Sequence, residues 1–138
     1  MNSPTILTRV PGLPKFQDVP EVRLRYTSGA LVTELDDDTA VHALEFRPVQ
    51  AVRITTWDAS VDPGLLPRDG IFENTSSAWI RDLRRSLSTN DPDADFLERA
   101  RHFVIACYDE IVEVIAWDVS YSVTRSTEVN NWPNNSRR

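Results

Sequence analysis

The feature that most constrains the fold is a pair of apolar segments in the last third of the chain. HFVIACY (residues 102–108) and IVEVIAW (residues 111–117) flank the pair Asp109–Glu110. Two adjoining runs rich in β-branched and aromatic residues predict a β-hairpin that buries at least one face. The chain therefore has to build its core around an antiparallel sheet.

A two-residue turn at Asp109–Glu110 predicts the register of this hairpin. One face then holds only apolar side chains, and we expect it to be core: Phe103, Ile105, Cys107, Val112, Val114 and Ala116. On the other, mixed face, Glu113 lies opposite Ala106. Glu113 is then four residues along the strand from His102, roughly 13 Å away, which is too far for a hydrogen bond.

Four side chains of the mixed face form a candidate binding face: His102, Tyr108, Glu113 and Trp117. A carboxylate among aromatic and aliphatic groups either packs against another element or lines a pocket. Beyond Trp117 the apolar positions change from even to odd numbers. A β-bulge near Trp117–Asp118 would reconcile the two halves, but we favour a bend that wraps a long strand around the core.

An earlier hairpin is predicted where EVRLRYT and ALVTELD flank Ser28–Gly29. One face of its first strand carries Val22, Leu24 and Tyr26. On the opposite face Arg23 lies across from Glu34, and we interpret the two as a cross-strand ion pair on a solvated face. This register separates apolar from charged side chains, as a half-buried antiparallel pair requires.

Two further strands are predicted over residues 41–46 and 49–57, divided at Pro48, which cannot donate to a ladder. His42 shares a face of the first of them with apolar neighbours. We interpret it as a hydrogen-bonded structural residue, with a role as acid or base as the alternative.

After a long loop, the apolar residues have the spacing of an α-helix. The apolar positions predict a helix with one buried face: Trp79, Ile80, Leu83 and Leu87. Residues 74–77 offer several N-cap side chains. The other side is basic, and we interpret it as a solvated face: Arg81, Arg84 and Arg85. A short helix capped by Asp93 is expected next, with Phe96 and Leu97 on its buried side.

These elements predict a single α+β domain over residues 21–124. We expect a curved, mostly antiparallel sheet of about six or seven strands, with one main helix and one short helix on a face. Residues 1–20 hold four prolines and predict an extended lead-in. Residues 125–138 are polar and predict a loose tail.

Composition excludes several classes of function. The net charge of −6 argues against a protein that binds nucleic acid, and no apolar run is long enough for a membrane-spanning helix. The single cysteine cannot form an intrachain disulfide and fits a cytoplasmic protein. Nothing resembles a nucleotide-binding loop, a zinc cluster or a Ser-His-Asp set, so we expect no cofactor and no metal ligands.

The pattern SSAWIRDLRRS, followed by RHFVIACYDEIVEVIAWDV, covers roughly residues 76–120. It resembles the C-terminal half of an uncharacterised family of small bacterial proteins. The shared features are a tryptophan in a helix, a histidine beside an aromatic residue, and a run like DEIVEVIA. The resemblance implies a helix followed by a hairpin and carries over no function.

The sequence therefore favours a non-enzymatic protein-interaction module. We expect an acidic immunity-type or regulatory factor that masks a partner protein, and a basic partner would suit its charge. The alternative is a small-molecule enzyme or ligand-binding protein whose pocket on the curved sheet uses Glu113 or His42. A homodimer formed through a sheet edge is a third interpretation.

Overall fold

The computed structural model describes residues 5–59 and 66–125, and its strands form one seven-stranded antiparallel sheet. The strands are β1 Leu7–Arg9, β2 Glu21–Thr27, β3 Ala30–Asp36, β4 Ala40–Thr56, β5 Ile71–Asn74, β6 Arg101–Ala106 and β7 Glu110–Arg125. The helices are α1 Ala78–Asn90 and the 3₁₀ turns η1 Trp57–Ala59 and η3 Phe96–Arg99. This is the α+β fold that the sequence predicts.

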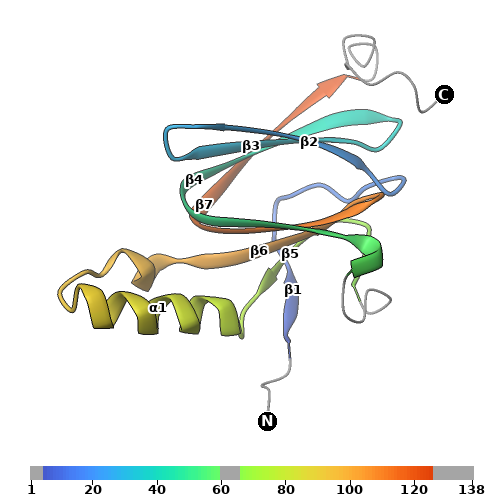
Figure 1. Ribbon diagram of the computed structural model, residues 1–138. Coiled ribbons are helices and arrows are strands. Elements are labelled where there is room, and N and C mark those ends of the chain that lie inside the picture. Colours follow the sequence, from blue (N-terminus) through green and yellow to red (C-terminus); the bar gives the residue numbers. More distant parts are fainter. Residues whose placement is uncertain (1–4, 60–65, 126–138) are drawn as a thin grey trace.

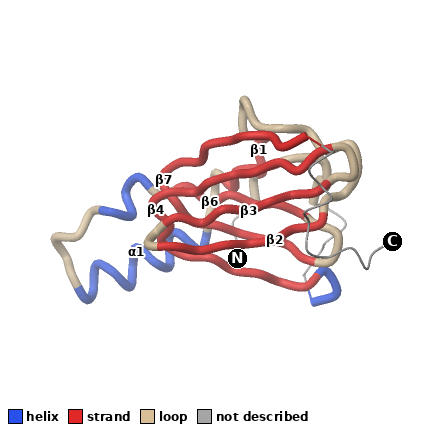
Figure 2. The backbone as a smooth tube through the Cα atoms, turned by 90° about the horizontal axis from the view of Figure 1, so that it is seen from above, coloured by secondary structure: helices blue, strands red, loops and turns tan. Residues whose placement is uncertain are grey.

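The sheet is strongly curved because its two longest strands, β4 and β7, both bend (Figure 1). The spatial order of the strands is β1-β5-β6-β7-β4-β3-β2. The bend carries β2 and β3 over β5 and β6, and the core fills the space between these halves. Its centre is fully buried: Leu35, Leu44, Phe46, Phe103, Ile105, Val112 and Val114. Helix α1 lies beneath β6 and extends past one end of the sheet (Figure 2).

The predicted division at Pro48 is wrong, since β4 runs without a break from Ala40 to Thr56. Its ladder with β7 instead shifts by one residue between Val49 and Ala51. The irregularity that we considered near Trp117 is thus found on the neighbouring strand. An extra residue at this point sharpens the local twist and helps both long strands to bend.

The first hairpin has the predicted register. Its ladder pairs Val22 with Leu35, Leu24 with Thr33, and Arg23 with Glu34. Ser28 and Gly29 have φ angles of +47° and +84°. Two successive positive φ angles are typical of a type I′ turn, which matches the twist of the flanking strands. The predicted ion pair is present, since Arg23 Nε donates to Glu34 Oε1 at 2.8 Å.

Residues of the predicted lead-in contribute to the sheet and to its core. Strand β1 pairs with β5, and Val10 and Phe16 after it are buried against the rest of the core. A three-residue strand is too short to give an alternating pattern in the sequence. The predicted tail from residue 126 onward lies outside the described residues.

The second hairpin has the predicted faces and a different register. The Cys107 N–H donates to the Glu110 carbonyl at 2.7 Å, so the turn lies at Tyr108–Asp109 and not at Asp109–Glu110. Glu113 consequently lies opposite Val104. The new register differs by two positions, so each side chain stays on its predicted face. The predicted core face is buried throughout: Phe103, Ile105, Cys107, Val112, Val114 and Ala116.

Cys107 is expected to react slowly with thiol reagents in the native protein. Its side chain is fully buried, and burial raises the pKa of the thiol to about 12. The thiolate is the reactive form, so both effects slow labelling. The measurement compares the rate of labelling by a chromogenic disulfide reagent with and without denaturant. Equally fast labelling in both conditions would show that Cys107 is accessible.

The predicted short helix is the 3₁₀ turn η3, and it begins after Asp95 rather than Asp93. Leu97 is buried as expected, whereas Phe96 is 41 % exposed. In one 3₁₀ turn the successive residues Phe96 and Leu97 point in different directions, so only one of them can face the core.

Candidate functional site

The central residue of the candidate site is His102, which lies on β6 and is 2 % exposed. Its Nδ1 lies 2.7 Å from Ser77 Oγ, and its Nε2 lies 2.8 Å from Glu113 Oε1. The predicted separation of His102 and Glu113 is therefore wrong. In the observed register His102 lies opposite Ile115, so Glu113 is its diagonal neighbour, within reach of a long side chain.

Ser77 reaches His102 because it is the N-cap of α1. Its Oγ accepts the N–H of Ile80 at 3.0 Å, as an N-cap serine does. The hydroxyl proton is then free to be donated to His102 Nδ1. With Nδ1 as the acceptor, Nε2 carries the ring proton and donates a hydrogen bond to Glu113. One neutral tautomer thus satisfies every bond from Ser77 to Glu113.

Glu113 is fixed from its other side by Arg53 on β4. Arg53 Nε and Nη2 donate to the two carboxylate oxygens at 3.0 and 2.9 Å. Burial raises the pKa of Glu113, but the hydrogen bonds from His102 and Arg53 outweigh it and lower the pKa to about 2. At neutral pH Glu113 is therefore a charged acceptor that orients His102.

Trp79, predicted to face inward from α1, covers this network. Its ring meets the His102 ring edge to face, with centroids 5.4 Å apart. The Arg53 guanidinium lies 4.3 Å from the Trp79 ring centroid, in a cation–π contact. The network is thus shielded from water along the side that Trp79 covers, which strengthens its hydrogen bonds.

A cavity of 320 Å³ opens beside Ser77 and His102. It lies between β5, the start of α1 and the start of β6, and is lined by Glu73, Asn74, Thr75, Ser77, Ile80, Arg81, Arg84, Ala100, Arg101 and His102. Its size is at the lower end of the range of small-molecule sites, which is about 300–1,000 Å³.

The three arginines of the cavity differ in their partners. Arg101 Nη2 donates to Glu73 at 2.8 Å, and Arg84 donates to the carbonyl oxygen of Leu97 at 2.9 Å. Arg84 was expected on a solvated face, and this bond holds it half-buried instead. The Arg81 guanidinium is exposed and has no polar partner within the described part of the chain.

The other two members of the predicted binding face lie elsewhere. Tyr108 is 62 % exposed at the hairpin turn, six residues along from His102, a span of roughly 20 Å in an extended strand. Trp117 Nε1 donates to the Phe96 carbonyl at 2.7 Å, and the Arg99 guanidinium lies 4.1 Å from its ring centroid. Trp117 thus holds η3 against β7.

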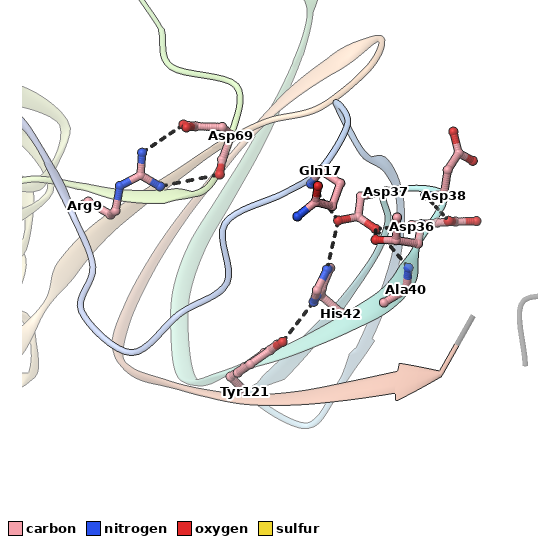
Figure 3. A network of polar contacts seen from close by, with 10 residues as sticks. Arg9, Gln17, Asp36, Asp37, Asp38, Ala40, His42, Asp69 and Tyr121 are labelled. Atoms are coloured by element: carbon pink, nitrogen blue, oxygen red, sulfur yellow. Dashed lines mark hydrogen bonds and ion pairs between the residues drawn. The ribbon is translucent and has the colours of Figure 1, made fainter. Parts of the chain in front are cut away.

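His42 occupies a separate network in the other half of the sheet (Figure 3). Its Nε2 lies 3.1 Å from Asp37 Oδ2, and its Nδ1 lies 2.9 Å from the Tyr121 hydroxyl. Burial raises the pKa of Asp37, but backbone N–H groups and Thr39 donate to it and lower the pKa to about 2. His42 is thus hydrogen-bonded at both ring nitrogens, and its role, structural or as an acid or base, stays a prediction.

Two residues of the His102 network were not predicted as site residues. Ser77 was expected only as one of several N-cap choices. Arg53 was not distinguished from other arginines, although the β4–β7 ladder places it directly opposite Glu113. In both cases the sequence identifies the residue type needed, but the contact depends on tertiary structure.

Within residues 5–59 and 66–125 no group of three His, Cys, Asp or Glu side chains is arranged to hold a metal ion. No helix in the same residues is long and apolar enough to cross a membrane. Comparisons with family models, curated proteins and solved structures find no match to this chain.

Proposed function

We propose that the protein binds a small anionic molecule, a carboxylate or a phosphate, in the cavity beside His102. The observation that carries the proposal is the charge of the cavity. Three arginines line it against a single carboxylate, that of Glu73, although the chain as a whole has a net charge of −6. The cationic cavity concentrates small anions, while the net negative charge of the rest of the protein repels polyanions with an extended backbone.

Arg81 is the residue best suited to contact the ligand. It lies in the first turn of α1, where the helix dipole also favours an anion. A guanidinium can donate two parallel hydrogen bonds to a carboxylate or a phosphate. Because Arg81 has no polar partner among the described side chains, no existing ion pair has to break before it binds.

The expected protein partner stays a prediction, as does a cytoplasmic location. Large apolar side chains with high exposure are spread over several elements of the described chain, including Tyr26, Ile54, Phe96, Tyr108 and Val123. A stable interface usually has a compact core of such anchors. We therefore rank the ligand-binding proposal above the interaction module.

Replacing Arg81 by glutamine is expected to weaken the binding of inorganic phosphate or succinate at least about tenfold. The change removes a charged hydrogen bond worth about 1.5–3 kcal/mol, and 1.4 kcal/mol corresponds to a factor of ten. Isothermal titration calorimetry at low ionic strength measures both affinities. Arg85→Gln is the matched control, because Arg85 is on the same helix, pairs with Asp82 and does not line the cavity.

An equal loss in both variants would indicate a general effect of charge and contradict a defined site. Unchanged binding in Arg81→Gln would remove Arg81 from the site. The absence of any binding to the wild-type protein would contradict the proposal itself.

A further inference from the structure

We infer that Ser77 is a nucleophile, activated by His102, and that the cavity hydrolyses carboxylic esters whose acyl part carries a second anionic group. This inference rests on the proposed anion site and adds a reaction to it. It is carried by the hydrogen-bonded order Ser77, His102, Glu113, whose first two members line the cavity.

The three residues have the mutual geometry of an activated serine. A serine nucleophile needs a base within about 2.6–3.2 Å, and the base needs a third group to orient it. Ser77 Oγ lies 2.7 Å from the His102 ring, and Glu113 lies 2.8 Å from the far nitrogen. Serine here faces Nδ1, which serves as well as Nε2, because either nitrogen of a neutral imidazole accepts while the other donates.

Glu113 and Arg53 are positioning residues in this scheme. Glu113 fixes the tautomer in which Nδ1 is unprotonated, and its charge stabilises the imidazolium that forms when Ser77 loses its proton. Arg53 holds both oxygens of Glu113 and so fixes the direction of the carboxylate. An N-cap serine that only stabilises α1 would need neither residue.

The reaction has two balanced halves. Ser77 Oγ attacks the carbonyl carbon while its proton passes to His102 Nδ1, and the bond to the alcohol oxygen then breaks as that oxygen takes the proton from His102. Water attacks the resulting acyl-serine, His102 accepts a proton from the water, and Ser77 regains a proton as the carboxylic acid leaves. The N–H groups of Ala78 and Trp79 follow Ser77 directly and lack acceptors within the helix, so in this scheme they are the candidate donors to the developing oxyanion.

The arginines select the substrate. The anionic group of the acyl part would pair with Arg81, which leaves the ester carbonyl to approach the serine at the inner end of the cavity. A volume of 320 Å³ admits a short acyl group of this kind. After the rate without protein is subtracted, we therefore expect mono-4-nitrophenyl succinate to be hydrolysed faster than 4-nitrophenyl acetate, and Arg81→Gln to remove this preference. The subtraction is needed because the carboxylate of the succinate monoester attacks its own ester carbonyl in free solution.

The direct test uses a fluorophosphonate probe, from which a nucleophilic serine displaces fluoride. Mass spectrometry is expected to find the label on Ser77 in the wild-type protein. Ser77→Ala is expected to abolish labelling, and so is Ser77→Asn, which keeps a side chain able to cap α1. Ser76→Ala is the control and is expected to label like the wild type, because the Ser76 side chain is outside the network.

Glu113→Gln separates chemistry from binding. We expect its labelling rate to fall at least tenfold while its affinity for phosphate changes less than twofold, at a temperature where the variant is folded. An equal loss of both would indicate that Glu113 only maintains the shape of the cavity, and would overturn its role in activating Ser77.

The two proposals fail in different ways. Phosphate binding without labelling of Ser77 in the wild-type protein would overturn the nucleophile and leave the anion site standing. Labelling of Ser77 without phosphate or succinate binding would overturn the anionic substrate class instead. Labelling that persists in Ser77→Asn would place the reactive residue elsewhere and overturn the inference.

Discussion

Replacing Phe103 by alanine is expected to lower the free energy of unfolding by about 3–5 kcal/mol. Phe103 is fully buried, and its ring centroid lies 5.2 Å from that of Phe46, across the space between the two halves of the sheet. Truncation loses the transfer free energy of the ring and leaves a cavity that rigid strands on both sides cannot close. Unfolding in guanidinium chloride measures the change, provided that the free energy of unfolding depends on denaturant concentration with the same slope in both proteins.

Ile105→Ala tests the same face one pleat further along β6. Ile105 is also fully buried and lies opposite Val112, so we expect a loss of about 2–5 kcal/mol. Phe96→Ala is the matched control for Phe103, since Phe96 is 41 % exposed and its loss is expected within about 0.5 kcal/mol. A loss that small at Phe103 would place its side chain outside the core.

The faces of the second hairpin could be predicted from the sequence, whereas its register could not. Burial depends on whether a position is odd or even, so any register that differs by two residues buries the same side chains. The turn decides between such registers, and both Tyr108–Asp109 and Asp109–Glu110 lack the glycine that marks the turn of the first hairpin. That ambiguity alone produced the wrong separation of His102 and Glu113.

The remaining members of the site depend on contacts that no local pattern encodes. Ser77 meets His102 only because α1 packs beneath β6. Arg53 faces Glu113 because of the register shift between Val49 and Ala51. Without that extra residue, Val52 would lie opposite Glu113, and the carboxylate would lose its two bonds to the guanidinium. A bulge that redirects a side chain in this way is frequent beside functional sites.

Replacing Glu113 by glutamine is expected to lower the free energy of unfolding at pH 7 by about 1.5–3 kcal/mol. The amide oxygen of glutamine can still accept a hydrogen bond, but its NH2 group is a donor and would meet the N–H groups of Arg53. The neutral amide also cannot balance the guanidinium charge. His102 is 2 % exposed, so water cannot readily replace a lost acceptor at its Nε2. Glu98→Gln is the matched control, since Glu98 is exposed and its replacement is expected to change stability by less than about 0.5 kcal/mol.

The effect of Glu113→Gln is also expected to depend on pH. Burial raises the pKa of Glu113, but the hydrogen bonds from His102 and Arg53 outweigh burial and lower the pKa from an ordinary 4.5 to about 2 in the folded protein. A folded-state pKa below the unfolded value means that the carboxylate stabilises the fold above pH 4.5 and loses this contribution as the pH falls toward 2. The difference in the free energy of unfolding between wild type and Glu113→Gln should therefore be smaller at pH 3 than at pH 7.

Asp37 provides the internal comparison for this measurement, because its pKa is also lowered to about 2 and it belongs to the separate His42 network. The difference in the free energy of unfolding between wild type and Asp37→Asn should likewise be smaller at pH 3 than at pH 7. The effects of the two substitutions should add, since the networks share no partner. Denaturant unfolding of the wild type, both variants and the double variant at pH 7 and pH 3 gives all the required differences. If Glu113→Gln lowers the free energy of unfolding equally at both pH values, the carboxylate charge does not stabilise the network, and the side chain contributes by packing alone.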